Sequence, residues 1–204
     1  MLTSKMPVMV FDFGGVLLDW NPWYLYRQFF DSPQAMEAFF REIDFSGWNL
    51  EQDRGRPFAE AVTLHAQQFP HHAGLIRAYH EQWPASIGGA IPGTVDILTQ
   101  LKARGYPLYA LSNWSAETHY LIRPQYEFFE WFDGIVLSGE VKLIKPDPKI
   151  YQLLLEKAGA PAEDCLFIDD SLTNIRAAQA LGFGTIHFQS PEQLRAELSA
   201  RNIL

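Results

Sequence analysis

Carboxylates stand at the ends of two apolar runs in this chain, where buried strands would end. Asp12 follows the run Val8–Phe11, and Asp169-Asp170 follow the run Cys165–Ile168. The carboxyl ends of strands in an open α/β sheet face the crevice that binds ligands, so we expect these carboxylates to meet. A carboxylate there can serve as a nucleophile that forms a covalent intermediate. Carboxylates also offer the oxygen ligands that Mg²⁺ prefers.

Two more polar segments lie next to predicted strands or helices and could contribute to the same site. Ser112-Asn113 follow the run Tyr106–Leu111, and Lys145 precedes a helical run that begins at Pro148. Taken singly, Ser112 is typical of a turn, Lys145 of a solvated surface, and the aspartate pair of a helix cap. Taken together on one sheet edge, the segments indicate a reactive site in which Lys145 offsets the repulsion among the carboxylates.

Gly14, two residues after Asp12, has no side chain, whereas many enzymes built this way carry a second carboxylate at this place. A glycine cannot protonate a leaving group, and the loss of a positioned acid typically lowers the rate by about 10²–10⁴-fold. The leaving group must therefore need little help, or another group must supply the proton. Asp53 and His65 are candidates for that donor, although each also fits an ordinary surface position.

The elements that would position these residues alternate between strand and helix, which is the pattern of a parallel sheet with crossover helices. The sequence therefore predicts an α/β fold. The predicted strands are Val8–Phe11, Tyr106–Leu111, Gly134–Leu137, Cys165–Ile168 and Thr185–Phe188, and the predicted helices between them are Thr94–Arg104, Pro148–Ala158 and Leu172–Leu181.

Residues 20–88 have a different pattern, with aromatic residues at helical spacing and no strand alternation. Prolines and glycines divide them into four or five short helices. We expect an all-helical insertion, residues 19–88, within a core of residues 1–18 and 89–204, with a hinge at Ser86–Gly89. Its aromatic residues should form a core of their own, with one or two lining a substrate cavity; they are Trp23, Tyr26, Phe30, Phe39, Phe40, Phe58, Phe69, Tyr79 and Trp83.

The composition narrows the classes of function. The chain has 204 residues, a net charge of −8 and 48% hydrophobic residues, which permits a sizeable core and argues against nucleic-acid binding. No apolar run reaches the roughly 18 residues of a membrane span. The single Cys165 favours a reducing compartment, and the first strand begins too soon after Lys5 to leave room for a signal peptide. We expect a cytoplasmic monomer or homodimer with no nucleic-acid or membrane partner.

With these features the chain resembles the haloacid dehalogenase-like (HAD) hydrolase superfamily over essentially its whole length. The helical insertion is similar to the C1-type cap of that superfamily. The resemblance implies a Rossmann-like core whose five-stranded parallel sheet has the order 5-4-1-2-3. The four matching motifs are Asp12–Leu17, Leu111-Ser112-Asn113, Lys145-Pro146, and Asp169-Asp170 with Asn174.

The resemblance also implies a reaction and a metal. It implies Mg²⁺-dependent hydrolysis of a small phosphorylated metabolite through an aspartyl-phosphate on Asp12. By the same resemblance, Asp12, Asp170 and the backbone carbonyl of Gly14 would bind Mg²⁺ directly, and Asp169 would act through a water molecule.

The remaining motif residues would bind the phosphate. Lys145 would bridge the nucleophile and the phosphoryl oxygens, and Ser112 and Asn113 would hold these oxygens with the Ser112 hydroxyl and nearby backbone amides. Asn174 would orient the loop or Lys145, although it also fits an ordinary helix surface. Substrate specificity should lie in the insertion, because closing such a cap excludes water and contacts the leaving group; the candidates are Trp20, Trp48, Asn49, Asp53 and Arg54.

The segment around Asp12 is similar to the glucose-1-phosphate phosphatase branch of the superfamily, which makes a sugar phosphate a candidate substrate. The alternative is a metal-independent 2-haloacid dehalogenase, because halide leaves without a proton and Leu111–Ser115 resembles the second motif of those enzymes. Asp169-Asp170 favour the phosphatase, since a carbon electrophile has no need of Mg²⁺. A third hypothesis is a non-catalytic sugar-phosphate binder.

Overall fold

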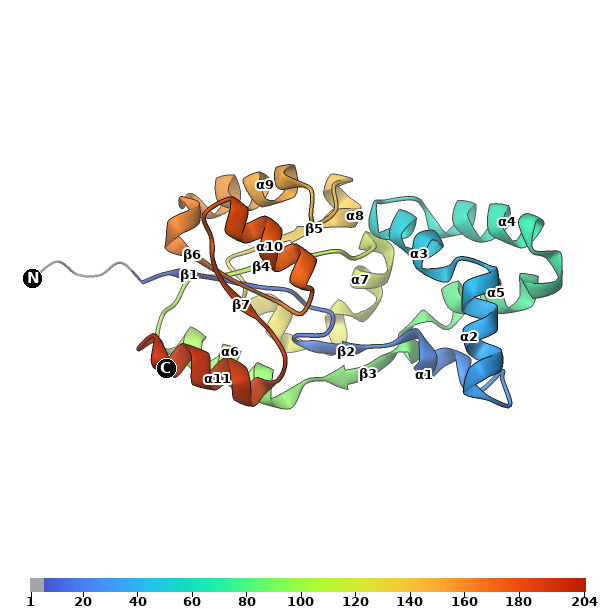
Figure 1. The fold of residues 1–204 in the computed structure, drawn as a ribbon, viewed down its shortest axis with the longest axis horizontal. Coiled ribbons are helices and arrows are strands. Elements are labelled where there is room, and N and C mark those ends of the chain that lie inside the picture. The colour runs from blue at the N-terminus through green and yellow to red at the C-terminus, as the bar shows by residue number, and fades with distance from the viewer. Residues whose placement is uncertain (1–5) are drawn as a thin grey trace, which may run out of the picture.

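The computed structural model describes residues 6–204. Residues 1–5 lie outside the described residues. They include the start of the predicted core segment and the residues on which the expectation of no signal peptide depends. Figure 1 shows two parts along the long axis of the molecule: a sheet with helices on both faces, and a group of helices beyond one end of that sheet.

Five parallel strands form the sheet, with β1 (Val8–Phe11) at its centre between β4 (Leu108–Ser112) and β6 (Cys165–Asp169). The edge strands are β5 (Gly134–Leu137) and β7 (Gly184–His187). Every residue of β1 is buried, as a strand covered on both faces requires. The α/β class and the five-stranded parallel sheet are therefore confirmed.

The observed strand order is β5-β4-β1-β6-β7, which differs from the predicted order 5-4-1-2-3. The difference arises because the chain contains two strands that the prediction omitted. These are β2 (Leu18–Trp20) and β3 (Ile87–Ala90), which pair with each other in a separate two-stranded sheet. With these two left out of the count, each strand of the main sheet has the neighbours that the prediction gave it.

Four helices cover the two faces of the sheet (Figure 1). Met9 and Phe11 pack with apolar side chains of α6 and α11 on one face, and Val8 and Val10 pack with those of α9 and α10 on the other. Successive residues of a strand point to opposite faces, so the unbroken apolar run of β1 contributes to both halves of the core. The helices are α6 (Pro92–Ala103), α9 (Pro148–Ala158), α10 (Leu172–Ala180) and α11 (Pro191–Ala200).

The remaining elements of this part are short. They are α7 (Ala116–Ile122), α8 (Ser138–Val141) and the 3₁₀ helices η3 (Arg123–Gln125), η4 (Glu127–Trp131) and η5 (Ala162–Asp164). Of these, α7 and α8 follow directly after β4 and β5 in the chain, on the side of the sheet that faces the helical insertion in Figure 1.

The helical insertion consists of α1 (Pro22–Tyr26), α2 (Pro33–Glu42), α3 (Phe45–Asp53), α4 (Phe58–Gln68), η1 (Pro70–His72), α5 (Ala73–Glu81) and η2 (Trp83–Ser86). Aromatic rings fill its centre, as the sequence predicts. Tyr26 and Tyr79 are fully buried, the Tyr26 and Phe39 ring centroids lie 5.1 Å apart, and those of Phe45 and Tyr79 lie 4.9 Å apart. The Phe45–Tyr79 pair is edge-to-face, a geometry that adds to the stabilisation that burial gives.

The pair β2–β3 joins the insertion to the sheet (Figure 1). The backbone N–H of Asn21 donates to the carbonyl of Ser86 at 2.8 Å, so the two connections stay together where the insertion begins and ends. The predicted hinge Ser86–Gly89 lies at the end of η2 and in β3. Its action as a hinge and the boundaries 19 and 88 stay predictions.

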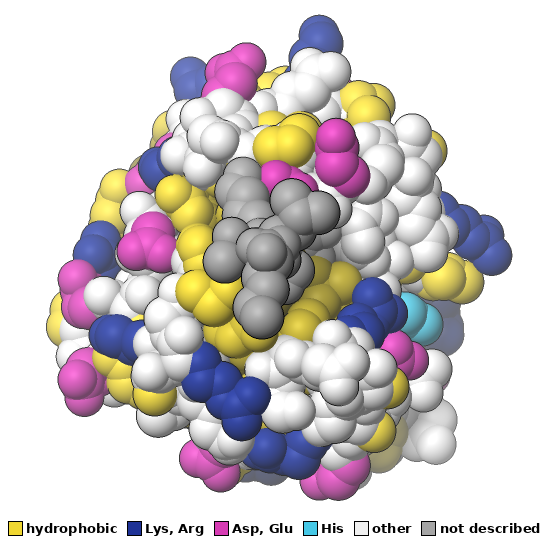
Figure 2. All heavy atoms as spheres, turned by 90° about the vertical axis from the view of Figure 1, so that its left-hand side faces the viewer, with side chains coloured by type: hydrophobic (Ala, Val, Ile, Leu, Met, Phe, Trp, Pro, Cys, Tyr) yellow, Lys and Arg dark blue, Asp and Glu magenta, His cyan; other side chains and the backbone are white. Residues whose placement is uncertain are grey.

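The surface gives two further observations. Within residues 6–204, no helix has the length and apolar character needed to cross a membrane. Figure 2 looks onto the amino end of the sheet, opposite the insertion, where basic and acidic side chains lie interspersed around apolar ones.

Phe39→Ala should lower the free energy of unfolding by about 3–5 kcal/mol, the range for removing a buried aromatic ring. Phe39 is 2% exposed and packs against Tyr26 and Phe30. Phe29→Ala is the matched control in the same insertion, because that ring is 41% exposed and its removal should change stability by about 0.5 kcal/mol or less. Urea unfolding followed by tryptophan fluorescence measures both, and equal losses would contradict the proposed core.

Candidate active site

Three neighbouring strands bring the predicted site residues together. Asp12 follows β1, Ser112 ends β4 and Asp169 ends β6. In the sheet register Phe11 lies beside Ala110 on one neighbour and beside Ile168 on the other. The three polar residues therefore emerge side by side at the carboxyl edge of the sheet, as the sequence predicts.

Lys145 lies between two of the carboxylates. Its Nζ is 2.8 Å from Oδ2 of Asp12 and 2.6 Å from Oδ2 of Asp169, and it donates to the backbone carbonyl of Leu111 at 2.9 Å. The side chains of Lys145 and Asp169 are fully buried, whereas that of Asp12 remains 11% exposed. Of these three groups, the Asp12 carboxylate is the one that a ligand can reach.

Two amide side chains hold this arrangement in place. Asn113 donates from Nδ2 to the carbonyl of Lys145 at 3.0 Å and accepts from its backbone N–H at 2.8 Å. Asn174 donates to both oxygens of Asp169, at 3.0 and 3.2 Å. Asn113 thus fixes the backbone of Lys145, and its predicted contact with phosphate stays a prediction. Asn174 acts on Lys145 through Asp169, in line with the orienting role that the resemblance implies.

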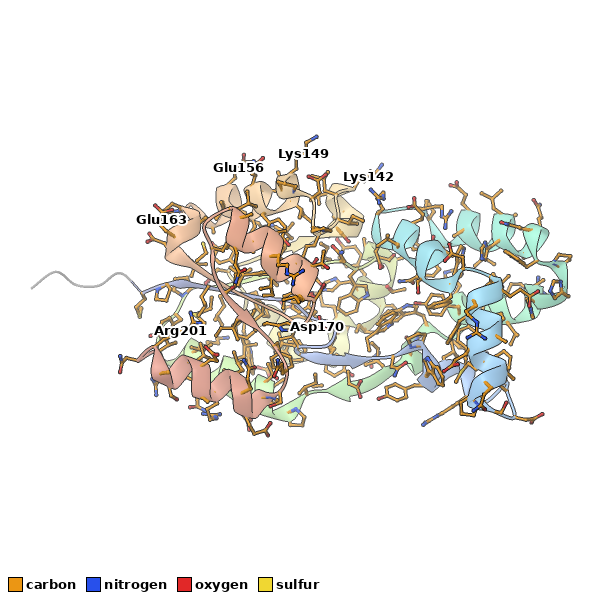
Figure 3. All side chains as sticks on the ribbon, viewed as in Figure 1. Lys142, Lys149, Glu156, Glu163, Asp170 and Arg201 are labelled. Carbon is orange, nitrogen blue, oxygen red and sulfur yellow. The ribbon has the colours of Figure 1, made fainter. Side chains whose placement is uncertain are left out.

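Asp170 completes a group of three carboxylates with Asp12 and Asp169. One oxygen of each lies within 4.8 Å of the others. Asp170 retains solvent exposure, and Figure 3 shows it at the inner edge of the core, whereas Glu156 lies on the outer side of α9. The chain approaches Asp170 closely at Gly15, whose φ of +72° and lack of a Cβ allow the contact; an added Cβ would stand 2.3 Å from Oδ2 of Asp170.

The carboxylates outnumber the positive charge beside them. Burial raises the pKa of Asp12 to about 7, an effect that Lys145 opposes and Asp169 reinforces. Burial also raises the pKa of Asp170. For Lys145, burial lowers the pKa, but the two carboxylates in contact with it raise it above its usual value overall. One lysine facing three carboxylates leaves negative charge uncompensated, which suits a divalent cation with oxygen ligands.

A pocket opens beside these residues, between the core and the helical insertion, and its empty space, part of which is open solvent, is about 450 Å³. Gly14 and Ser112 border it from the core, and an added Cβ at Gly14 would meet nothing within 4 Å. The other lining residues are Leu18, Trp20, Asn49, Asp53, Phe58, Tyr79, Trp83, Ile87, Asn113, Trp114 and Thr118. Among the described residues that line the pocket, none is Lys or Arg, five are aromatic and five carry a polar or acidic side chain.

The structure brings only some of the predicted specificity residues to this pocket. Trp20, Asn49 and Asp53 line it. Trp48 instead is buried in the core of the insertion, where its Nε1 donates to the carbonyl of Ala61 at 3.3 Å. Arg54 is exposed and pairs with Glu51 at 3.5 Å. Neither Trp48 nor Arg54 lines the pocket, so the prediction is corrected for these two residues.

Neither His65 nor His119 lines this pocket. His65, one of the two candidate proton donors, contacts the carbonyl of Ile43 through Nε2 at 2.7 Å and stacks on Trp48, away from the pocket. His119 is buried against Phe13, and burial lowers its pKa to about 4. Of the candidate proton donors, Asp53 is therefore the one beside the site.

Several pocket residues were not singled out from the sequence. Phe58, Tyr79 and Trp83 were expected to contribute to the aromatic core, and the structure shows that they line the pocket as well. Their helical spacing indicated burial, but it could not indicate which rings face a cavity. Thr118 carries no sequence signal of this kind.

Comparison with known proteins gives the following relatives. The family model for haloacid dehalogenase-like hydrolases matches residues 6–182. The sesquiterpene phosphatase AstK of Aspergillus oryzae is 28% identical over 190 residues, which cover 91% of this chain and 91% of that protein. A phosphorylated carbohydrates phosphatase of Thermotoga maritima is 25% identical over 206 residues, which cover 89% of this chain and 86% of that protein. Haloacid dehalogenases also match, over about half of this chain.

Solved structures show the same architecture. The magnesium complex of a HAD family enzyme, BT-2542 of Bacteroides thetaiotaomicron, has a TM-score of 0.72 to this structure at 25% sequence identity. The similarity covers 91% of this chain and 94% of that chain. The likeness therefore extends over both the sheet and the helical insertion.

Gly15→Ala should lower the free energy of unfolding by about 1–3 kcal/mol, the usual strain of a side chain at positive φ, and the new Cβ would also collide with Asp170. Gly14→Ala is the matched control and should change stability by about 0.5 kcal/mol or less, because a Cβ there meets open space. Thermal unfolding measures both variants. An equal loss in both would contradict the close approach at Gly15.

Proposed function

The chain belongs to the haloacid dehalogenase-like hydrolases, and on that premise we propose that it is a Mg²⁺-dependent phosphatase. It hydrolyses a small phosphorylated metabolite through an aspartyl-phosphate on Asp12. One observation carries the proposal: Asp12, Asp169 and Asp170 meet within 4.8 Å around a single buried lysine. A site for a divalent cation and a phosphoryl dianion needs this excess of carboxylate.

Asp12 is the nucleophile in this proposal. Its carboxylate attacks phosphorus to form the aspartyl-phosphate, and water then releases phosphate from that intermediate. Lys145, 2.8 Å from Asp12, fixes the attacking carboxylate and offers positive charge to the phosphoryl oxygens. Ser112 borders the pocket and donates its hydroxyl to the same oxygens. Groups held in place before the reaction stabilise its developing charge without reorganising.

The residues present fit Mg²⁺. Asp12, Asp170 and the backbone carbonyl of Gly14 would hold the ion directly. Asp169 would contact it through water, because its oxygens already accept hydrogen bonds from Lys145, Asn174 and the backbone N–H of Ser171. When bound, the ion supplies positive charge that offsets the charge of the phosphoryl group.

The pocket supports an uncharged leaving group. Aromatic and polar uncharged side chains contribute most of its lining, and the described lining residues offer no Lys or Arg to a second anionic group. A sugar, as the sequence suggests, or an apolar alcohol would fit this lining. The carbohydrate phosphatase and the sesquiterpene phosphatase among the relatives are named for substrates of these two kinds.

The alternative, a metal-independent 2-haloacid dehalogenase, would use Asp12 to attack carbon. Two observations favour the phosphatase over this alternative. A carbon electrophile gives no reason to gather three carboxylates, which repel one another. The pocket lining also presents no cation to the carboxylate of a haloacid or to the departing halide.

A release assay tests the proposal. Wild-type protein should release phosphate from one or more members of a panel of sugar, acyl and prenyl phosphates with Mg²⁺, and EDTA should abolish the release. It should release no chloride from 2-chloropropionate. Asp12→Asn, which keeps the shape of the side chain but removes the nucleophile, should lose all turnover.

Two outcomes would contradict it. Chloride release that persists in EDTA, with no phosphate release, would establish the dehalogenase. Binding of sugar phosphates without turnover of any substrate would establish the non-catalytic binder. Asn174→Ala should lower phosphate release less than Asp12→Asn does, because Asn174 acts only by positioning Asp169.

A further inference from the structure

The pocket beside Asp12 contains one carboxyl group that the mechanism above does not use. Gly14 leaves open space where an acid could stand on the core, and across the pocket Asp53 ends α3 of the helical insertion. Among the described residues that line the pocket, Asp53 is the only one with a carboxyl group.

We propose that Asp53 is the general acid of the reaction, supplied by the helical insertion in place of the side chain that Gly14 lacks. This inference rests on the proposed function, because it requires phosphoryl transfer to Asp12. It names the group that protonates the leaving oxygen.

A chain of hydrogen bonds within the insertion orients the Asp53 side chain. Asn49 Nδ2 donates to Oδ2 of Asp53 at 3.0 Å. The Tyr79 hydroxyl in turn donates to Oδ1 of Asn49 at 2.8 Å, and Trp83 Nε1 donates to the Tyr79 oxygen at 3.2 Å. All four residues line the pocket, so the chain holds Asp53 within the wall that a substrate would touch.

The end of α3 is also fastened to the core. The Ser138 hydroxyl donates to the backbone carbonyl of Asp53 and accepts from the backbone N–H of Trp114 at 2.8 Å. Two residues beyond Asp53, Gly55 has a φ of +100°, and a Cβ there would stand 2.8 Å from the carbonyl of Gly139. These contacts set Asp53 against the loop that follows β4, the strand that ends at Ser112 of the phosphate site.

The surroundings keep the Asp53 carboxyl protonated. Burial raises its pKa to about 8; the backbone N–H of Ser115 opposes this rise, and the charge of Asp12 adds to it. The pocket lining provides no cation to stabilise the charged form. At neutral pH the side chain therefore holds a proton that it can give away, which is the property a general acid needs.

The proton and the electrons balance in both half-reactions. Asp12 forms a bond to phosphorus as the bond from phosphorus to the leaving oxygen breaks. The electron pair stays on that oxygen, which takes the proton of Asp53 and departs as an alcohol. In the second half, the Asp53 carboxylate takes a proton from water as the water oxygen bonds to phosphorus. The bond from phosphorus to Asp12 breaks and its electron pair stays on Asp12, which releases phosphate and restores the Asp12 carboxylate and the Asp53 carboxylic acid.

The test varies the leaving group. p-Nitrophenyl phosphate releases an acidic phenol that departs without help, whereas benzyl phosphate releases a weakly acidic alcohol that needs a proton. Asp53→Asn should lower kcat/KM for benzyl phosphate by about 10²–10⁴-fold, the usual contribution of a general acid, and change that for p-nitrophenyl phosphate much less. Gly14→Asp, added to Asp53→Asn, should restore part of the benzyl phosphate activity, because it puts a carboxyl into the open space on the core.

Glu51→Gln is the matched control, since it removes one carboxylate of the same helix that is 47% exposed and pairs with Arg54. It should leave both substrates unchanged. An equal loss on both substrates in Asp53→Asn, with no restoration by Gly14→Asp, would overturn the acid role and assign Asp53 to structure or binding. If wild-type protein releases phosphate from neither substrate nor from the metabolite panel, the proposed function itself fails, which is a distinct outcome.

Discussion

The excess of carboxylate around one buried lysine is the constraint on which the rest of the site depends. The ends of β1 and β6 bring the carboxylates of Asp12 and Asp169 into contact with Lys145, and Asp170 lies beside them. Charges out of contact with water are stable only when they are paired and hydrogen-bonded, and removing one partner of a buried pair costs about 3–5 kcal/mol. The side-chain amides of Asn113 and Asn174, from two other segments of the chain, donate hydrogen bonds to the backbone of Lys145 and to the Asp169 carboxylate.

The same constraint gives each carboxylate a different task. Asp169 is fully buried and accepts hydrogen bonds on both oxygens, so it serves chiefly to hold Lys145. The Asp12 carboxylate keeps 11% exposure, as the nucleophile role proposed for it requires. Asp53 lies in the part of the pocket wall that the insertion contributes, where burial raises its pKa to about 8, as the proposed acid role requires. These three aspartates carry the same functional group, and their different surroundings suit them to different roles.

Strand ends could be predicted from the sequence because their apolar runs and the polar residues after them are local signals. These signals predict that Asp12, Ser112 and Asp169 lie on one edge of the sheet. The strands β2 and β3 could not be found in this way, because they are short and β3 contains Gly88 and Gly89 in place of an alternating pattern.

The sequence also could not predict which face of α3 meets the pocket. Asn49 and Asp53 are four residues apart and share one face of the helix, but only the docking of the insertion on the core decides that this face meets the pocket. Trp48 and Arg54 lie close by in the chain and point elsewhere. The bond from Asn113 to Lys145 joins residues 32 positions apart, a distance at which local patterns carry no information.

The most direct test of this account follows the oxygen of water in a single turnover. Excess enzyme, one phosphorylated substrate and ¹⁸O-labelled water are mixed with Mg²⁺, and mass spectrometry then examines the released phosphate and the peptide that contains Asp12. Attack by Asp12 on phosphorus, followed by attack of water on the same phosphorus, predicts the label in phosphate and none in Asp12. Label in the Asp12 carboxylate would contradict the account, because it would mean that water attacks the carbonyl carbon of an ester, as in a dehalogenase.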